Sequence, residues 1–374
     1  LIVKGRENLL LQSNQFDTTW SLANTSVTSG QSGYDGTNDA WLLTKSASVF
    51  SRINQSVSIS GVSTYSVYAK GTSTNFCLRD NVSGHRLEVN LNDGSITLQQ
   101  TEIIVANVED VGGGWYRVSA TFNETLTTVQ IYPKFNSADV VSVTIQNAQL
   151  EQGLVATPYI PTTTTTAQAG VLENTPRLNY TTGVTNPYLL LEPSRTNFIY
   201  SSEYAGGWAG INANITTTNN ATTSPEGVDN AVKLEDITTS SSNQIVNFGS
   251  DLGGINVVGK TYTGSIYIKP VNPSDAGKDI LLSIQRNFGD YEGLNVIFEI
   301  DSADWKRYDL TYTFTGAGAG DQVGAVLKIL KADTTIDDIY VYGAQLEESF
   351  FLTSYIPTYS VSATRAYDYT KFID

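Results

Sequence analysis

Hydrophobic and polar residues alternate along many short stretches of this chain. In residues 64–70, Tyr65, Val67 and Ala69 share one side of an extended backbone, while Ser66 and Tyr68 share the other. The same alternation occurs over residues 115–122, 129–132 and 294–300. Turn-forming Gly and Asn separate these runs, and no stretch of a dozen residues shows a helical period. The pattern predicts an all-β protein built as a sandwich or barrel.

The second half of the chain repeats the first half in the same order. Residues 6–10 (RENLL) return as 195–199 (RTNFI), and residues 148–151 (AQLE) return as 344–347. Four further pairs are 35–40 and 226–231, 66–70 and 265–269, 115–117 and 305–307, and 159–162 and 355–358. The offset stays near roughly 190 residues, which suits a whole domain rather than a solenoid unit. The chain is therefore expected to hold two copies of one β-domain.

The repeat divides the 374 residues into four predicted segments. Residues 1–160 are the first copy, 161–188 an extended linker, 189–358 the second copy, and 359–374 a C-terminal tail leading to a missing or following segment. The linker assignment depends on the five threonines at 162–166, a low-complexity run without apolar alternation.

Charge and composition narrow the classes of partner. The formal net charge of −15 repels phosphate backbones, so no nucleic acid is expected. No apolar run approaches the roughly 18 residues that span a bilayer, so no membrane is expected either. One cysteine and one histidine exclude an internal disulfide and a multi-histidine metal site. The absence of methionine, with Leu1 at the start, predicts a fragment or a processed chain.

Several motifs resemble known families. The opening Asn-Leu-Leu…Ser…Phe…Trp, the run 65–70 (YSVYAK) and the run 114–119 (GWYRVS) resemble the jelly-roll carbohydrate-binding module superfamily. Residues 189–197 (LLLEPSRTN), 343–348 (GAQLEE), 353–358 (TSYIPT) and 363–366 (ATRA) are similar to repeats of bacteriophage tail-fibre and virion-fibre proteins. The resemblance implies two tandem jelly-roll β-sandwiches in an extracellular virion protein. In that setting such proteins are often homotrimers that contact other virion proteins and a host surface polysaccharide or glycan.

Sugar-binding sandwiches stack aromatic rings on pyranose rings and bind the hydroxyls with polar side chains. Tyr68 and Tyr267 occupy equivalent positions opposite the aliphatic residues, as do Arg117 and Arg307. The full set of ligand-binding candidates is Tyr68, Arg117, Tyr132, Tyr267, Arg307 and Tyr291. The alternative for Tyr68 and Tyr267 is buried framework, because both copies keep them and a functional site often differs between copies.

Members of the resembled superfamily often hold a structural calcium ion. Asp35 and Asp39 in the first copy, with Glu226 and Asp229 in the second, offer hard oxygen ligands in glycine-containing loops. The last strand carries Gln146 where the family often has an aspartate, which weakens this hypothesis and leaves solvated turns as the alternative. No other cofactor is expected.

No residue pattern indicates catalysis, so we predict that the chain is not an enzyme. His85 lies between Gly84 and Arg86 in a turn and is expected to be exposed. The favoured function is recognition of host glycans by a fibre or adhesin. The alternatives are a structural spacer or decoration of the virion, and accessory modules of a glycan depolymerase. An aromatic set present in only one copy would favour binding.

Overall fold

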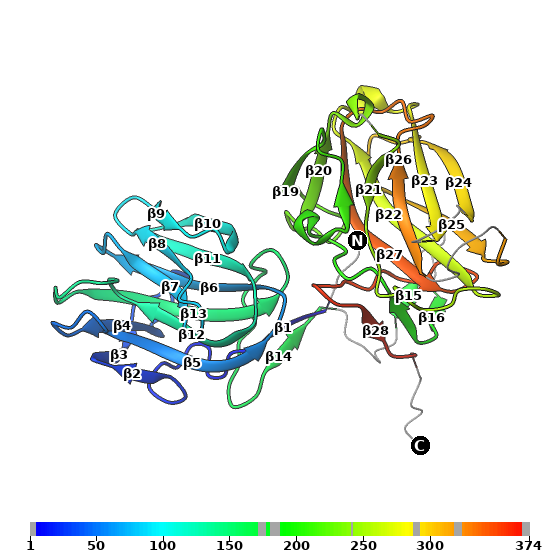
Figure 1. The fold of residues 1–374 in the computed structure, drawn as a ribbon. Coiled ribbons are helices and arrows are strands. Elements are labelled where there is room, and N and C mark those ends of the chain that lie inside the picture. Colours follow the sequence, from blue (N-terminus) through cyan, green and yellow to red (C-terminus); the bar gives the residue numbers. More distant parts are fainter. Residues whose placement is uncertain are drawn as a thin grey trace, which may run out of the picture. The chain divides into compact units, whose positions relative to one another are not determined.

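A computed structural model describes residues 5–170, 177–179, 188–240, 242–286, 292–317 and 324–368. The chain divides into two compact units, one of residues Gly5–Gly170 and one formed by Val171–Asp374 with Leu1–Lys4. We call them the first and the second unit. Each unit consists of two layers of antiparallel strands (Figure 1), which confirms the tandem all-β sandwich fold.

The first unit contains two six-stranded sheets and a two-stranded one. We call the sheet of order β10-β11-β6-β13-β4-β3 the covered sheet, because the segment after β13 folds back onto it. The sheet of order β2-β5-β12-β7-β8-β9 is called the open sheet, and β1 pairs with β14. The strands are β1 Arg6–Asn8, β2 Ser21–Ala23, β3 Thr25–Gln31, β4 Ala40–Lys45, β5 Arg52–Ile59, β6 Val62–Gly71, β7 Phe76–Asp80, β8 Arg86–Asn90, β9 Ser95–Gln99, β10 Ile103–Gly112, β11 Trp115–Asn123, β12 Leu126–Tyr132, β13 Ser142–Gln152 and β14 Ala167–Ala169.

The second unit repeats this plan with five-stranded sheets. Its covered sheet has the order β19-β20-β27-β22-β25, its open sheet has the order β18-β21-β26-β23-β24, and β17 pairs with β28. The strands are β15 Arg177–Asn179, β16 Tyr188–Leu190, β17 Arg195–Asn197, β18 Gly210–Ile211, β19 Thr216–Thr222, β20 Ala231–Glu235, β21 Gln244–Asn247, β22 Thr261–Pro270, β23 Asp279–Arg286, β24 Gly293–Glu299, β25 Lys306–Thr313, β26 Ala325–Leu330, β27 Ile339–Glu348 and β28 Ala363–Arg365. Short 3₁₀ turns lie at Ala205–Gly207, Ile237–Thr239 and Pro273–Asp275.

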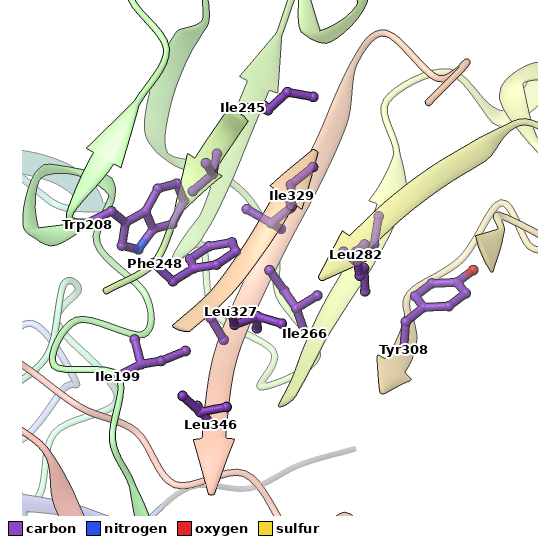
Figure 2. Packing of buried hydrophobic residues seen from close by; sticks show 14 of the residues in the cluster. Ile199, Trp208, Ile245, Phe248, Ile266, Leu282, Tyr308, Leu327, Ile329 and Leu346 are labelled. Atoms are coloured by element: carbon purple, nitrogen blue, oxygen red, sulfur yellow. The ribbon is translucent and has the colours of Figure 1, made fainter. Parts of the chain in front are cut away.

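A separate hydrophobic core fills each sandwich. In the second unit, Trp208 packs edge-on against Phe248 with ring centroids 4.9 Å apart, among aliphatic residues of both sheets (Figure 2). Trp20 packs beside Phe16 in the first unit at 5.2 Å. Both tryptophans are buried, and their indole N–H groups bond backbone carbonyls, so they seal the opening strand of each unit onto its core.

A buried asparagine ties the ends of the first unit together. The amide nitrogen of Asn8 donates to the carbonyls of Ala148 and Ile160, and its oxygen accepts from the N–H groups of Leu10 and Leu150. Asn197 makes the matching four bonds in the second unit, with Ala344, Ile356, Ile199 and Leu346. A primary amide with two donors and one carbonyl acceptor can satisfy all four backbone groups at once.

The segment that follows the last long strand lies back over the covered sheet in each unit. We call residues 153–162 and 349–358 the return segments. In the first, Glu151 accepts from the N–H and hydroxyl of Thr157, while Gln149 accepts from the N–H of Ile160. In the second, Glu347 and Gln345 hold Thr353 and Ile356 in the same way. The repeated AQLE motif therefore encodes this attachment.

The unit boundaries differ from the predicted segments at two places. The predicted linker begins at 161, but Thr162 is buried and donates its hydroxyl to the carbonyl of Leu10, and β14 pairs with β1. The predicted tail begins at 359, but β28 pairs with β17. The sequence gave no sign of these pairings because the paired strands lie far apart along the chain. Part of the predicted linker, residues 171–176 and 180–187, lies outside the described residues.

The helical segments of the described chain are all short turns, and none of them is long and apolar enough to cross a bilayer.

We predict that Asn8→Ala lowers the free energy of unfolding of the first unit by about 3 kcal/mol or more, because it leaves buried backbone groups without partners. Hydrogen exchange monitored by mass spectrometry should show faster opening in residues 5–170 and unchanged protection in the second unit. Asn38→Ala, at an exposed loop position, is the matched control. Equal protection in Asn8→Ala and in the wild type would contradict the prediction.

Candidate ligand-binding faces

Two of the predicted ligand residues in the first unit are buried by other parts of the same unit. Tyr68 is 7% exposed, and its ring stacks on Tyr34 with centroids 3.7 Å apart. Arg117 is 8% exposed and donates to the carbonyl of Thr157 and the hydroxyl of Ser66. Its guanidinium carbon lies 5.3 Å from the centre of the Tyr68 ring. Both side chains are therefore already engaged with the chain itself.

The second unit repeats this arrangement. Arg307 donates to the carbonyl of Thr353 at 2.7 Å and to the hydroxyl of Ser265 at 3.0 Å, and it lies over the Tyr267 ring at 5.2 Å. Burial raises the pKa of Tyr267 above its ordinary value, although the nearby Arg307 opposes this. The return segments bind Arg117 and Arg307, and Tyr34 stacks on Tyr68, which favours the framework alternative for this set. Tyr267 and Arg307 remain partly exposed, so ligand binding at Tyr68, Arg117, Tyr267 and Arg307 stays a prediction.

The outer face of the open sheet is different, because no return segment lies over it. In the first unit, cross-strand pairing places Asn54, Gln130, Arg79 and Arg86 in one row across β5, β12, β7 and β8. Arg79 donates to the side-chain oxygen of Gln130 at 2.7 Å, and Gln130 donates to Asn81 at 2.9 Å. Asn54, Arg79 and Arg86 are each partly exposed.

Beside this row lies an aromatic pair flanked by arginines. Tyr132, one of the predicted candidates, is 3% exposed and packs edge-on against Phe135 at 5.0 Å. Arg52 lies 5.9 Å above the Tyr132 ring, and Arg86 lies 4.5 Å from the Phe135 ring. Glu88 accepts from Arg86 at 2.7 Å and orients it. We call Arg52, Arg79, Arg86, Tyr132 and Phe135 the arginine–aromatic face.

The matching face of the second unit lacks this set. Its corresponding row is Asn247, Lys328, Ser283 and Asn295. Lys328 is 8% exposed, and burial lowers its pKa from the ordinary value. The next row is aliphatic, with Leu330, Leu281 and Ile297. The open faces of the two copies therefore differ in chemistry, although their frameworks agree. Tyr291, the remaining predicted ligand residue, lies outside the described residues.

The acidic side chains of the first predicted calcium loop do come together, but they surround the side-chain amide of Gln146. The amide nitrogen of Gln146 donates to Asp39 at 2.6 Å and to Asp35 at 3.2 Å, while its oxygen accepts from the N–H of Tyr34. That backbone bond fixes which end of the amide faces the carboxylates. The Thr37 hydroxyl lies within hydrogen-bond distance of both aspartates and donates its one hydrogen to either of them. Protein N–H and O–H donors thus stand where a cation would stand, which does not suit a calcium site.

The two acids of the second predicted calcium loop bind different partners. Asp229 is exposed and accepts from the hydroxyl of Thr223 at 2.5 Å. Glu226 instead accepts from Asn230 at 3.1 Å and from the hydroxyl of Tyr342 at 3.0 Å. Glu203 lies beside Glu226, because both accept from Asn230. Calcium binding at Asp35, Asp39, Glu226 or Asp229 stays a prediction, and these donors give it no support.

Sequence reasoning missed the arginine–aromatic face apart from Tyr132. Arg52, Arg79, Arg86 and Phe135 come from separate strands and one loop, so no short motif joins them. One sequence pattern could have indicated this face. The alternation in residues 129–132 places Gln130 and Tyr132 on one side of the strand and core residues on the other. Glu203 gave no signal because it matches Asn14, a non-acidic residue, in the first copy.

Comparisons with known proteins find likeness at the level of solved structures. No family model matches the chain, and no curated protein matches it. The N-terminal CBM22-1–CBM22-2 tandem domain of Paenibacillus barcinonensis Xyn10C is 13% identical, with 91% of this chain and 98% of that chain covered and a TM-score of 0.29. The tandem CBM51 modules of Sp3GH98, a family 98 glycoside hydrolase from Streptococcus pneumoniae SP3-BS71, are 11% identical, with 92% and 100% covered and a TM-score of 0.22.

A CBM4 structure is 20% identical, covers 32% of this chain and 72% of its own, and has a TM-score of 0.24. All three TM-scores are low, so these likenesses do not say what this chain binds.

The aspartate–amide cluster makes a prediction about pKa. Burial by itself would raise the pKa of Asp35, but hydrogen bonds from Thr37 and Gln146 outweigh it and lower the pKa below the ordinary 3.8. Asp35 therefore stabilises the fold above its ordinary pKa, and this contribution is lost as the pH falls through the lowered value. Thr37→Val should move the Asp35 midpoint up towards 3.8, as measured by NMR titration of the carboxyl carbon. Thr37→Ser keeps the hydroxyl and should retain the low midpoint; identical midpoints in wild type and Thr37→Val would contradict the assignment.

Proposed function

We propose that this chain is a non-enzymatic glycan-binding protein and that the arginine–aromatic face of the first unit is its binding surface. The observation that carries this proposal is the asymmetry between the two open faces. Framework residues persist in both copies, but Arg52, Arg79, Arg86, Tyr132 and Phe135 gather in one copy alone among the described residues. A set that one copy keeps and the other lacks is not needed to build the sandwich.

The chemistry of this face suits a sugar. The partly exposed ring of Phe135 offers apolar surface for the C–H face of a pyranose, and the buried Tyr132 ring packs edge-on against it. The partly exposed guanidinium and amide groups beside it can bind hydroxyls or a carboxylate. Planar arginine side chains bind a carboxylate with two parallel bonds, so acidic sugars are favoured over neutral ones. The covered sheets support this choice of face, because their outer surfaces are occupied by the return segments.

We also propose that the chain belongs to an extracellular virion fibre, where it would join other virion proteins and contact host surface polysaccharide. This part rests on the sequence resemblance at 189–197, 343–348, 353–358 and 363–366. Size-exclusion chromatography with light scattering should give three chains per particle, since a trimer would multiply weak sites. A monomer at all concentrations would contradict the trimer.

The binding proposal is tested with the full chain on a bacterial glycan microarray, followed by calorimetry with the best oligosaccharide. Phe135→Ala and Arg79→Ala should each weaken binding about tenfold, corresponding to about 1.4 kcal/mol. Phe350→Ala removes an exposed phenylalanine of the second unit and should leave affinity unchanged. Absence of any glycan signal from the intact oligomer would favour the spacer, and unchanged affinity in Phe135→Ala and Arg79→Ala would place the site elsewhere.

A further inference from the structure

The single histidine of the chain lies between carboxylates in the first unit. Nδ1 of His85 is 3.1 Å from both carboxylate oxygens of Glu124, and Nε2 is 3.5 Å from Oε2 of Glu102. Ligand atoms of Asp80, His85 and Glu124 all lie within 4.8 Å of one another. The expectation of an exposed turn histidine was therefore wrong, since its side chain is 22% exposed and has partners on both ring nitrogens.

Three turns bring these residues together at one end of the sandwich. Asp80 is the last residue of β7, and His85 immediately precedes β8. Glu124 lies in the turn between β11 and β12, and Glu102 lies between β9 and β10. His85 and Glu124 are 39 residues apart in the sequence, so no local motif indicates this cluster.

The loop orients Asp80 and still leaves it a lone pair for a ligand, because Oδ2 accepts one N–H group whereas a carboxylate oxygen has two lone pairs. Oδ1 of Asp80 accepts from the N–H groups of Val82 and Ser83, and Oδ2 accepts from the N–H of His85. The hydroxyl of Ser83 donates to Oε2 of Glu124 at 2.9 Å. Asp80 is fully buried, so its carboxylate cannot swing away into solvent. Pre-arranged ligands lower the entropy that binding must offset.

One imidazole nitrogen with carboxylate oxygens is a donor set for a first-row transition ion, Zn²⁺ above all. Metal–ligand bonds of about 2.0–2.1 Å in a tetrahedron separate neighbouring donors by about 3.3 Å. Nδ1 of His85 and Glu124 now lie at a hydrogen-bond distance of 3.1 Å, and the three ligand atoms lie within 4.8 Å of one another, so a small side-chain shift would bring them onto one ion. Glu102 lies at the other ring nitrogen, where metal-bound histidines donate to a carboxylate that fixes their tautomer. The arrangement thus supplies both the ligands and their orienting partner.

At the corresponding corner of the second unit, two side chains of the chain itself form an ion pair. Arg286 is the last residue of β23 and Glu292 immediately precedes β24, which are the positions of Asp80 and His85 in the first unit. These two side chains are buried and form an ion pair, with Nε 3.8 Å from Oε2. Glu292 also accepts the N–H groups of Thr315 and Gly316. A guanidinium of the chain itself thus provides the positive charge there, whereas the first unit presents acids around an imidazole.

We propose that Asp80, Nδ1 of His85 and Glu124 bind one divalent transition ion, Zn²⁺ in preference to Ca²⁺, with Glu102 as the positioning residue on Nε2. The site adjoins the arginine–aromatic face, because Arg79 and Arg86 are the chain neighbours of Asp80 and His85, but its ligands are other residues and the test below does not use a glycan.

The test uses the full chain after removal of metals with a chelator, titrated with ZnCl₂ in a calorimeter. We expect one Zn²⁺ per chain in the wild type. His85→Gln should abolish this site, and Glu124→Gln should weaken it at least about tenfold. Glu109→Gln, an exposed glutamate of β10, is the control and should bind as the wild type does. Equal Zn²⁺ binding by His85→Gln and wild type, or tighter binding of CaCl₂ than of ZnCl₂, would overturn the proposal.

A second measurement on the unaltered chain covers the case of a variant that does not fold. Because the chain has one histidine, its imidazole proton signals in an NMR spectrum belong to His85 alone. Zn²⁺ should shift or broaden them and saturate at one equivalent, while CaCl₂ at the same concentration should leave them in place. Signals that stay unchanged through an excess of Zn²⁺ would show that the imidazole pairs only with Glu102 and Glu124, and the metal site would be rejected.

Discussion

Two buried amides, those of Asn8 and Asn197, are the contacts on which each sandwich depends. Each joins the opening strand, the last long strand and the return segment through four backbone hydrogen bonds. Such groups are costly to bury without partners, so the amide can satisfy them only if all three segments meet in one register. This constraint brings the return segment over the covered sheet. In the first unit it leaves the open sheet, with the partly exposed Asn54, Arg79 and Arg86, as the surface available to a ligand.

The comparison of the two copies separates structure from function. Residues that attach the return segments are the same in both, down to the arginine over the tyrosine in Arg117–Tyr68 and Arg307–Tyr267. The copies diverge at the open faces and at the β7–β8 and β23–β24 corners. On a chain with a net charge of −15, three arginines on one open face create a local exception to the overall charge. Short-range contacts there can hold an anionic glycan that the overall field repels.

The β7–β8 and β23–β24 corners differ in the positive group that lies beside their buried carboxylates. Arg286 and Glu292 neutralise each other inside the second unit. In the first unit Asp80 and Glu124 face the imidazole of His85, and the divalent ion that we propose there would supply the positive charge. In the Asp35–Asp39–Gln146 cluster no positive group is needed, because hydrogen-bond donors of the chain stabilise the carboxylates directly.

The sequence by itself determined the fold class and the duplication. Alternation with period two and the ordered repeats depend on local chemistry, which each stretch carries within itself. Alternation also told which residues share a side of a strand, as it did for Tyr68 and for Tyr132. It could not tell which side the return segment covers, because that depends on bonds such as Asn8 to Ile160, 152 residues apart. The arginine–aromatic face and the His85 cluster were decided only by tertiary structure, since cross-strand register and turn packing bring together residues that no motif connects.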